Sequence, residues 1–180
     1  MKLNLLILSV IMTCQTNAEA AEDRLITNGN FAKKSLKPWK IFATEKLIKP
    51  TFSIANGEVT ITSAKASPKQ SNEQFTQQLE KLKSNTKYTF SFQAKAENVL
   101  KPLVVTLSRS KDWTKGHYGL FRKITPTNEW KDYKMTFTTI EIEEGNLPQL
   151  KFLFGEIQGQ LSLRKIALIE VNKPIEIKFK

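Results

Sequence analysis

Alternation of apolar and polar residues is the dominant pattern along the chain, and it is clearest from Tyr88 to Glu97. In an extended chain, the aromatic residues and alanines of this stretch fall on one side. Its threonine, serine, glutamine, lysine and glutamate residues fall on the other. This pattern predicts a strand of an antiparallel sheet, with one face on a hydrophobic core and one face toward solvent.

Shorter stretches of similar character are separated by turn-forming residues along the rest of the chain. An Asn-Gly pair at 56–57 lies between two of them and predicts a tight hairpin. About ten short strands with no convincing long helix indicate an all-β fold, namely a β-sandwich jelly roll of antiparallel strands. The clearest expected strands are 39–42, 51–55, 59–63, 88–97, 103–109, 117–125, 130–139, 149–155 and 160–171.

Residues 72–83 fit two structures equally well. Phe75, Leu79 and Leu82 occur at helical spacing, with Glu80 and Lys81 between them, which favours an amphipathic helix. A strand over the same residues is an equal alternative, and the local pattern leaves the choice open.

Residues 1–20 have the layout of a secretory signal peptide: a lysine, a short apolar run, and small residues before a cleavage site after Ala20. The apolar run is too short to cross a bilayer. A lipoprotein signal ending at Cys14 is the alternative, although Thr13 is unfavourable before a lipidated cysteine. We expect a secreted or periplasmic protein in which 21–180 form a single domain, with no later transmembrane segment.

The chain carries 28 Lys and Arg against 17 Asp and Glu, which gives a formal net charge of +11. Such a surface attracts polyanions. For an exported protein, acidic polysaccharides and cell surfaces are better candidates than nucleic acid. The alternative is that evenly spread basic residues serve only solubility.

Residues that commonly carry catalysis or bind metals are scarce. His117 is the only histidine and Cys14 the only cysteine, which excludes cysteine-based or multi-histidine metal sites and any Ser-His-Asp system without His117. No phosphate-binding or dinucleotide motif occurs. Glu141, Glu143 and Glu144 cluster in one expected loop, where a solvated charge run is the better interpretation than a catalytic pair. We therefore expect no catalytic residue, metal or cofactor.

Several motifs follow one another in a specific order. They are Asn-Gly-Asn-Phe at 28–31, Trp39, Gln-Leu at 78–79, the strand at 86–96, a Thr, Trp, Tyr and Phe pattern at 124–137, Phe-Leu-Phe-Gly at 152–155, and a closing strand at 161–168. In this order the chain resembles the carbohydrate-binding modules of the family 4, 9 and 22 group, which are appended to cellulases and xylanases. The resemblance covers residues 25–171.

This resemblance implies a galactose-binding-like jelly roll, and it favours a strand for residues 74–79. It also implies binding of a glycan in a cleft on one face, through aromatic stacking and hydrogen bonds, without catalysis. Family members often carry a glutamate and an aspartate of a structural calcium site where this chain has Ala32 and Arg164. Because a guanidinium repels a cation that needs several oxygen ligands, we predict that this calcium is absent.

Aromatic candidates for sugar stacking lie around one polar loop. Trp113 is the strongest, because polar residues surround it and a core role is hard to explain there; anchoring of the loop is the alternative. His117 and Tyr118 follow the loop, and alternation requires one of them to face outward. Phe42 and Phe121 are weaker candidates, for which a core position is an alternative.

Polar candidates complete the expected ligand-binding set. Gln78 and Gln93 match positions where such modules present polar groups to the glycan. Lys95 shares the face of Gln93, and Arg109 begins the Trp113 loop, so both would suit an acidic sugar. Glu156 could accept hydrogen bonds from sugar hydroxyls. For each, an ordinary solvated side chain is the alternative.

The hypothesis is an exported, non-catalytic module that binds a polysaccharide or oligosaccharide, and not nucleic acid, with an acidic glycan favoured by the charge. The alternative is a β-sandwich interaction or adhesion protein that binds a protein or a cell-envelope partner. The sequence specifies neither the oligomeric state, nor which glycan is bound, nor whether it is bound along the chain or at its end.

Overall fold

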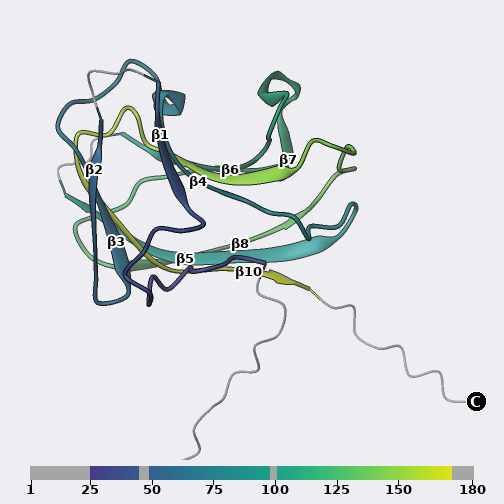
Figure 1. The fold of residues 1–180 in the computed structure, drawn as a ribbon, viewed down its shortest axis with the longest axis horizontal. Coiled ribbons are helices and arrows are strands. Elements are labelled where there is room, and N and C mark those ends of the chain that lie inside the picture. The colour runs from purple at the N-terminus through teal and green to yellow at the C-terminus, as the bar shows by residue number, and fades with distance from the viewer. Residues whose placement is uncertain (1–24, 45–48, 98–100, 172–180) are drawn as a thin grey trace, which may run out of the picture.

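Two antiparallel sheets of five strands each pack face to face in the computed structural model, which describes residues 25–44, 49–97 and 101–171 except the side chain of Trp113 (Figure 1). The prediction of an all-β sandwich is confirmed. The predicted signal peptide, its cleavage site and Cys14 lie outside the described residues.

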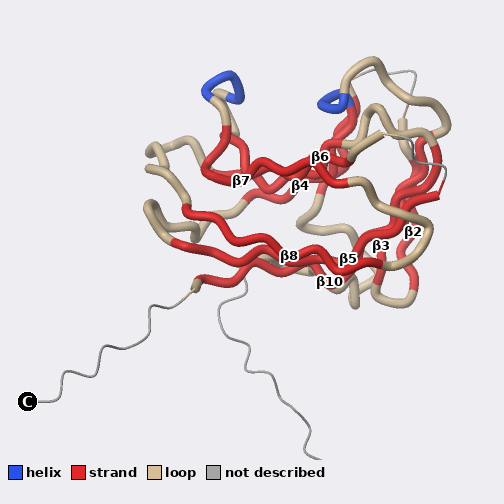
Figure 2. The backbone as a smooth tube through the Cα atoms, turned by 180° about the vertical axis from the view of Figure 1, so that it is seen from behind, coloured by secondary structure: helices blue, strands red, loops and turns tan. Residues whose placement is uncertain are grey.

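Each sheet draws its strands from distant parts of the chain. Sheet A has the order β1 (Lys40–Ala43), β4 (Glu73–Gln78), β9 (Pro148–Leu153), β6 (Leu103–Arg109) and β7 (His117–Ile124). Sheet B has the order β2 (Thr51–Ala55), β3 (Glu58–Ser63), β10 (Gly159–Glu170), β5 (Lys87–Glu97) and β8 (Lys131–Thr138). Two short 3₁₀ helices, η1 (Gln70–Asn72) and η2 (Trp113–Lys115), stand on the side of sheet A (Figure 2).

The alternation in β5 is what its sequence predicts, with buried and partly exposed residues in strict succession between the two ends. Phe90 and Phe92 project into the core, while β8 and β10 pair with β5 on either side. The register of β10 shifts between Arg164 and Ala167, where Lys165 has a positive φ of 51°. At this bulge the Ile166 N–H donates to the Gly29 carbonyl at 2.9 Å, which ties the N-terminal segment to β10.

The ambiguous stretch is a strand. Within β4, Phe75 and Gln77 both point inward, and Leu79, just after the strand, is also buried, so the true period is two. Gln77 hides this period in the sequence because a glutamine is unusual in a core. Its side-chain amide exchanges two hydrogen bonds of 2.8 Å with the Thr27 backbone, which satisfies the buried polar group.

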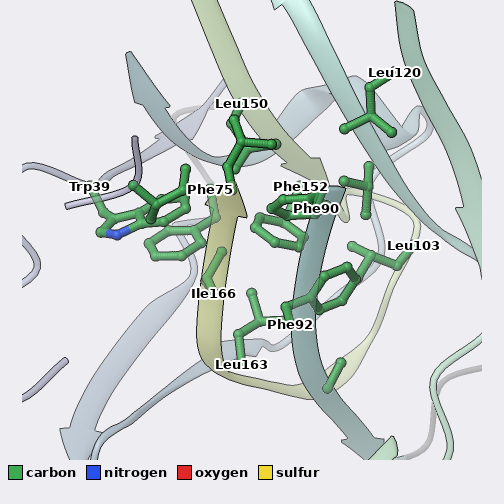
Figure 3. Close-up of a cluster of buried hydrophobic side chains, with 14 of the residues drawn as sticks. Trp39, Phe75, Phe90, Phe92, Leu103, Leu120, Leu150, Phe152, Leu163 and Ile166 are labelled. Atoms are coloured by element: carbon green, nitrogen blue, oxygen red, sulfur yellow. The ribbon is translucent and has the colours of Figure 1, made fainter. Parts of the chain in front are cut away.

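Aromatic rings from both sheets fill the space between them (Figure 3). Trp39 stacks on Phe75 with ring centroids 4.5 Å apart. Phe92 of sheet B meets Phe152 of sheet A edge-on at 5.2 Å. The Trp39 indole N–H donates to the Thr27 carbonyl, so the ring is buried without an unpaired donor.

The β2–β3 hairpin is also as predicted. Asn56 and Gly57 connect the strands with φ of 51° and 76°, which are the two positive values of a type I′ turn.

Candidate functional site

Alternate residues of the sheet A strands point away from the core and form the outer face of this sheet. Strand register arranges these side chains in three rows that cross the sheet. The first row is Gln78, Gln149, Ser108 and His117; the second is Lys40, Thr76, Lys151, Thr106 and Phe121; the third is Phe42, Gln74, Leu153, Val104 and Lys123. We refer to these rows together as the outer face of sheet A.

This face is recessed along its middle. Val104, Thr106 and Ser108 of β6 are buried, although they point away from the core that contains their neighbours. Sheet A also bows, so that η1 and η2 stand beyond its outer face at opposite ends (Figures 1 and 2). The buried side chains of β6 therefore give the outer face of sheet A a recessed middle between exposed edge strands, and we call this middle the hollow.

Aromatic side chains stand on both edge strands of the outer face. Phe42 on β1 is 51% exposed, and Phe121 on β7 is 41% exposed. The His117 imidazole stacks on Phe121 with centroids 5.7 Å apart. Burial, followed by repulsion from Arg109 and Arg122, lowers the pKa of His117 below its ordinary value, so the ring is neutral at pH 7. These rings offer flat apolar surfaces at the two margins of the hollow.

The middle of the outer face is polar. Gln74, Gln78 and Gln149 bring side-chain amides to it, and Gln74 Nε2 already donates to the Ser71 carbonyl at 2.7 Å. Two buried hydroxyl oxygens of this face, Thr76 Oγ1 and Ser108 Oγ, have no hydrogen-bond partner among the described residues. Amides and unpaired hydroxyls next to exposed rings are the groups that a sugar needs, because its hydroxyls require polar partners and its C–H faces pack on aromatics.

The charge of this face is entirely positive. The three rows contain Lys40, Lys123 and Lys151 and no acidic residue. Lys151 is half-buried, and burial lowers the pKa of its ammonium below the usual value.

The predicted amide pair is split between the two sheets. Gln78 lies on the outer face of sheet A, whereas Gln93 and Lys95 project from the outer face of sheet B. Gln93 Oε1 accepts from Arg164 Nε at 2.7 Å, and its amide donates to Asp132 at 2.9 Å. The expected arrangement of Gln78 and Gln93 in one cleft is therefore wrong, because the sandwich lies between them.

Lys95 lies on the same face as Gln93, and its ammonium group is already engaged by an aromatic ring. Its Nζ lies 5.1 Å from the ring centroid of Trp130, which also packs under the Arg164 guanidinium at 4.0 Å. Cation–π contacts of this kind hold the strands of sheet B together.

Tyr118 and Arg109 are internal. Tyr118 is 0% exposed, and its hydroxyl donates to the Asn146 carbonyl at 2.8 Å. The Arg109 guanidinium lies 4.6 Å from the Tyr118 ring, donates to the Lys115 carbonyl at 2.8 Å and lies 3.4 Å from Glu143. These contacts anchor the η2 loop, and they leave Tyr118 no exposed ring face for stacking. Of the two residues that follow the loop, His117 is the one that faces outward.

Two further candidates lie elsewhere. Trp113 lies in η2, but its side chain is outside the described residues. Glu156 lines a shallow pocket with Ser63, Lys101 and Gly159, and none of the residues of the three rows takes part in it.

Sequence reasoning did not identify two residues of the outer face as candidates, and it left two others open between core and surface. Gln149 and Lys151 alternate with the apolar residues of β9, so their outward direction was readable. Which sheet β9 joins was not readable, because strand order is a property of the whole fold. Phe42 and Phe121 had core positions as an alternative, and the structure places both rings at the surface.

No group of three His, Cys, Asp or Glu residues gathers closely enough for a metal ion in residues 25–44, 49–97 and 101–171. Arg164, which occupies the position of the family's calcium-binding aspartate, lies 3.9 Å from Glu58 and packs on Trp130. That the calcium is absent stays a prediction. Within the same ranges, no helix has the length and hydrophobicity needed to cross a bilayer.

A family model described as a carbohydrate binding domain matches residues 23–152. A search of curated proteins finds no match.

Solved structures of carbohydrate-binding proteins share the fold. One, titled "CBM4 structure and function", is 21% identical and has a TM-score of 0.70, covering 81% of this chain and 99% of its own. The second N-terminal cellulose-binding domain of Cellulomonas fimi β-1,4-glucanase C is 18% identical with a TM-score of 0.64, covering 86% and 98%. A putative sugar-binding protein of Bacteroides thetaiotaomicron is 12% identical with a TM-score of 0.59, covering 83% and 100%. At these identities the likeness shows the fold alone.

Proposed function

The chain belongs to the family of carbohydrate binding domains, and on that premise we propose that it is an exported, non-catalytic module that binds a polysaccharide on the outer face of sheet A. The observation that carries this proposal is the pair of exposed rings, Phe42 and Phe121, on opposite margins of one recessed, amide-lined face. The sequence pattern of residues 1–20 supports export.

The dimensions of the face suit a glycan chain rather than a single sugar. Neighbouring strands lie about 4.8 Å apart, so the four spacings from β1 to β7 span about 19 Å. A chain of several sugar units crosses this distance, with its ends near the two aromatic margins. The amides of Gln78 and Gln149 would then pair with hydroxyls between them.

Binding without hydrolysis is the activity that these groups support. Glycoside hydrolysis requires two carboxyl groups placed across the scissile bond. The three rows offer amides, hydroxyls and lysines, but no carboxylate. The lysines, with the net charge of +11, favour an acidic glycan.

Binding of the purified chain to soluble polysaccharides, measured by affinity gel electrophoresis and then by calorimetry, tests the proposal. The panel contains neutral β-glucan and xylan, with polygalacturonate and alginate as acidic polymers. We expect retardation by at least one polymer and no release of reducing ends. A chain that binds none of them, but captures a protein or cell-envelope partner, would contradict the proposal and favour an adhesion function.

A further inference from the structure

Lys151 occupies the centre of the outer face of sheet A. It lies within β9, the middle strand of the five, and in the middle row of the three. Thr76 of β4 is directly opposite on one side, and Thr106 of β6 is directly opposite on the other. The side chain therefore rises from the floor of the hollow between the two aromatic margins.

The Lys151 ammonium has no protein partner in the described part of the chain: no hydrogen bond, ion pair or cation–π contact engages it. Partial burial of this side chain removes water from a charge without supplying an acceptor. The lowered pKa of Lys151 has the same cause, since desolvation disfavours the charged form. An anion placed against it would offset that cost.

The groups around Lys151 favour an anion with several oxygens. Thr76 lies opposite Lys151, and Ser108 lies one row away on β6; among the described residues their hydroxyl oxygens have no hydrogen-bond partner, so both can donate to an anion. Thr106 Oγ1 is already committed to the Leu120 carbonyl at 3.0 Å. No acidic residue in the three rows competes for the charge.

Lys151 differs from the other two lysines of the face in its surroundings. Lys40 and Lys123 lie on the edge strands and are exposed, so water and salt screen their charges strongly. Charge-assisted hydrogen bonds are strongest where water is excluded, and that condition is met at the recessed centre.

We propose that Lys151, with the hydroxyls of Thr76 and Ser108, forms an anion subsite that binds a carboxylate or sulfate group on a sugar in the middle of the bound glycan. This inference rests on the proposed function and adds the position of the acidic group to it. The margins then bind sugar rings by stacking, whatever their charge, while the centre determines that the glycan is acidic.

Titrations at physiological ionic strength with four polymers test this subsite. Polygalacturonate and alginate supply carboxylates, carrageenan supplies sulfates, and xylan is neutral. The variants are Lys151→Met, Lys151→Arg and Lys134→Met. Lys134 lies on β8 and faces outward from sheet B, so its loss changes the net charge equally at a distant place.

We expect Lys151→Met to weaken binding of an acidic polymer at least tenfold and binding of xylan less than twofold, with Lys134→Met matching the wild type. Lys151→Arg should retain most of the affinity, because the cation persists. Whether the carboxylated or the sulfated polymer is preferred identifies the acidic group.

Equal losses for acidic and neutral polymers, or no loss in Lys151→Met, would overturn the subsite while the proposed function stood. Equal losses in Lys151→Met and Lys134→Met would also overturn it, because they would reveal only long-range attraction. Absence of binding to every polymer by the wild type would overturn the subsite and the proposed function together.

Discussion

Phe42 and Phe121 stand on opposite edge strands of sheet A, and both rings project from the same outer face. They frame the lysine- and amide-bearing middle of the sheet. Both are exposed, whereas the aromatic side chains at the centre of the core pack tightly between the sheets. This relationship separates residues available for a ligand from residues that hold the sandwich together.

Replacing either ring by alanine should weaken glycan binding about tenfold, or about 1.4 kcal/mol, because a stacking surface is lost at one margin. Calorimetric titration measures the change for Phe42→Ala and Phe121→Ala. Phe52→Ala is the matched control, since Phe52 is also 51% exposed but belongs to β2 of sheet B. Equal losses in all three variants would contradict the location of the site.

Gln78 and Gln93 should respond to alanine substitution in opposite ways. Gln78→Ala removes an amide from the outer face of sheet A and should weaken binding several-fold without changing the melting temperature. Gln93→Ala removes the acceptor of Arg164 and the donor to Asp132, so it should lower the free energy of unfolding by about 1 kcal/mol and leave binding unchanged. Urea denaturation measures the stability of both variants, and titration measures their glycan binding. Weaker glycan binding by Gln93→Ala would contradict the assignment of the site to sheet A.

Tyr118→Phe should destabilise the protein by about 1 kcal/mol, because the buried Asn146 carbonyl loses its donor. Tyr133→Phe is the control: the Tyr133 hydroxyl makes a longer, exposed hydrogen bond of 3.5 Å, and its removal should change stability little. Thermal unfolding of the two variants decides the point. A Tyr118→Phe protein as stable as the wild type would show that this bond does not anchor the loop.

The hydrogen bonds and ion pairs that hold the loop between β6 and β7 should stabilise the protein less in acid. Hydrogen bonds from Thr114 and then Lys115 lower the pKa of Asp112, and a hydrogen bond from Asn146 is the largest cause that lowers the pKa of Glu143. The stabilisation is therefore complete above the ordinary carboxyl pKa and is lost as the pH falls through the lowered values.

Melting temperatures from pH 7 down to about pH 3 measure this effect, since the ordinary carboxyl pKa lies near 4. The Asp112→Asn, Glu143→Gln double variant should lose less stability over the acid range than the wild type does. Parallel curves for the two proteins would assign the acid dependence to other carboxylates.

Gly119→Ala should lower the free energy of unfolding far more than Gly116→Ala does. Both glycines have positive φ, of 94° and 86°, so each substitution incurs a backbone cost of about 1–2 kcal/mol. A Cβ at Gly119 would also clash with the Thr138 carbonyl oxygen, whereas nothing lies within 4 Å of one at Gly116. Chemical denaturation measures the free energy of unfolding of both variants. Equal decreases in that free energy would mean that β7 and β8 separate readily.

The strands were predictable because most of them alternate without interruption. β5 shows this best, since its inward residues are all apolar and its outward residues all polar. β4 was ambiguous because one inward position holds Gln77, whose buried amide is satisfied by the backbone of Thr27, far away in sequence. No local pattern contains that partner.

The site was predictable only in part, for a topological reason. Alternation assigns Gln78 and Gln93 to outward positions, but it does not show that β4 and β5 join different sheets. Tyr118 was ambiguous in the same way, because the buried partners Arg109 and Asn146 come from other segments. The family resemblance supplied the kind of ligand that we propose, and strand order supplied the face that we propose for it.

The position of β10 has a consequence for how the protein folds. β10 is the middle strand of sheet B, between β3 and β5, and its bulge also holds Gly29. Until residues 159–170 have been synthesised, β3 and β5 have no strand to join them, and the N-terminal segment lacks the hydrogen bond between Gly29 and Ile166. Because these contacts join distant parts of the sequence, they form late and slowly. Completion of the sandwich therefore waits for synthesis of the central strand of sheet B.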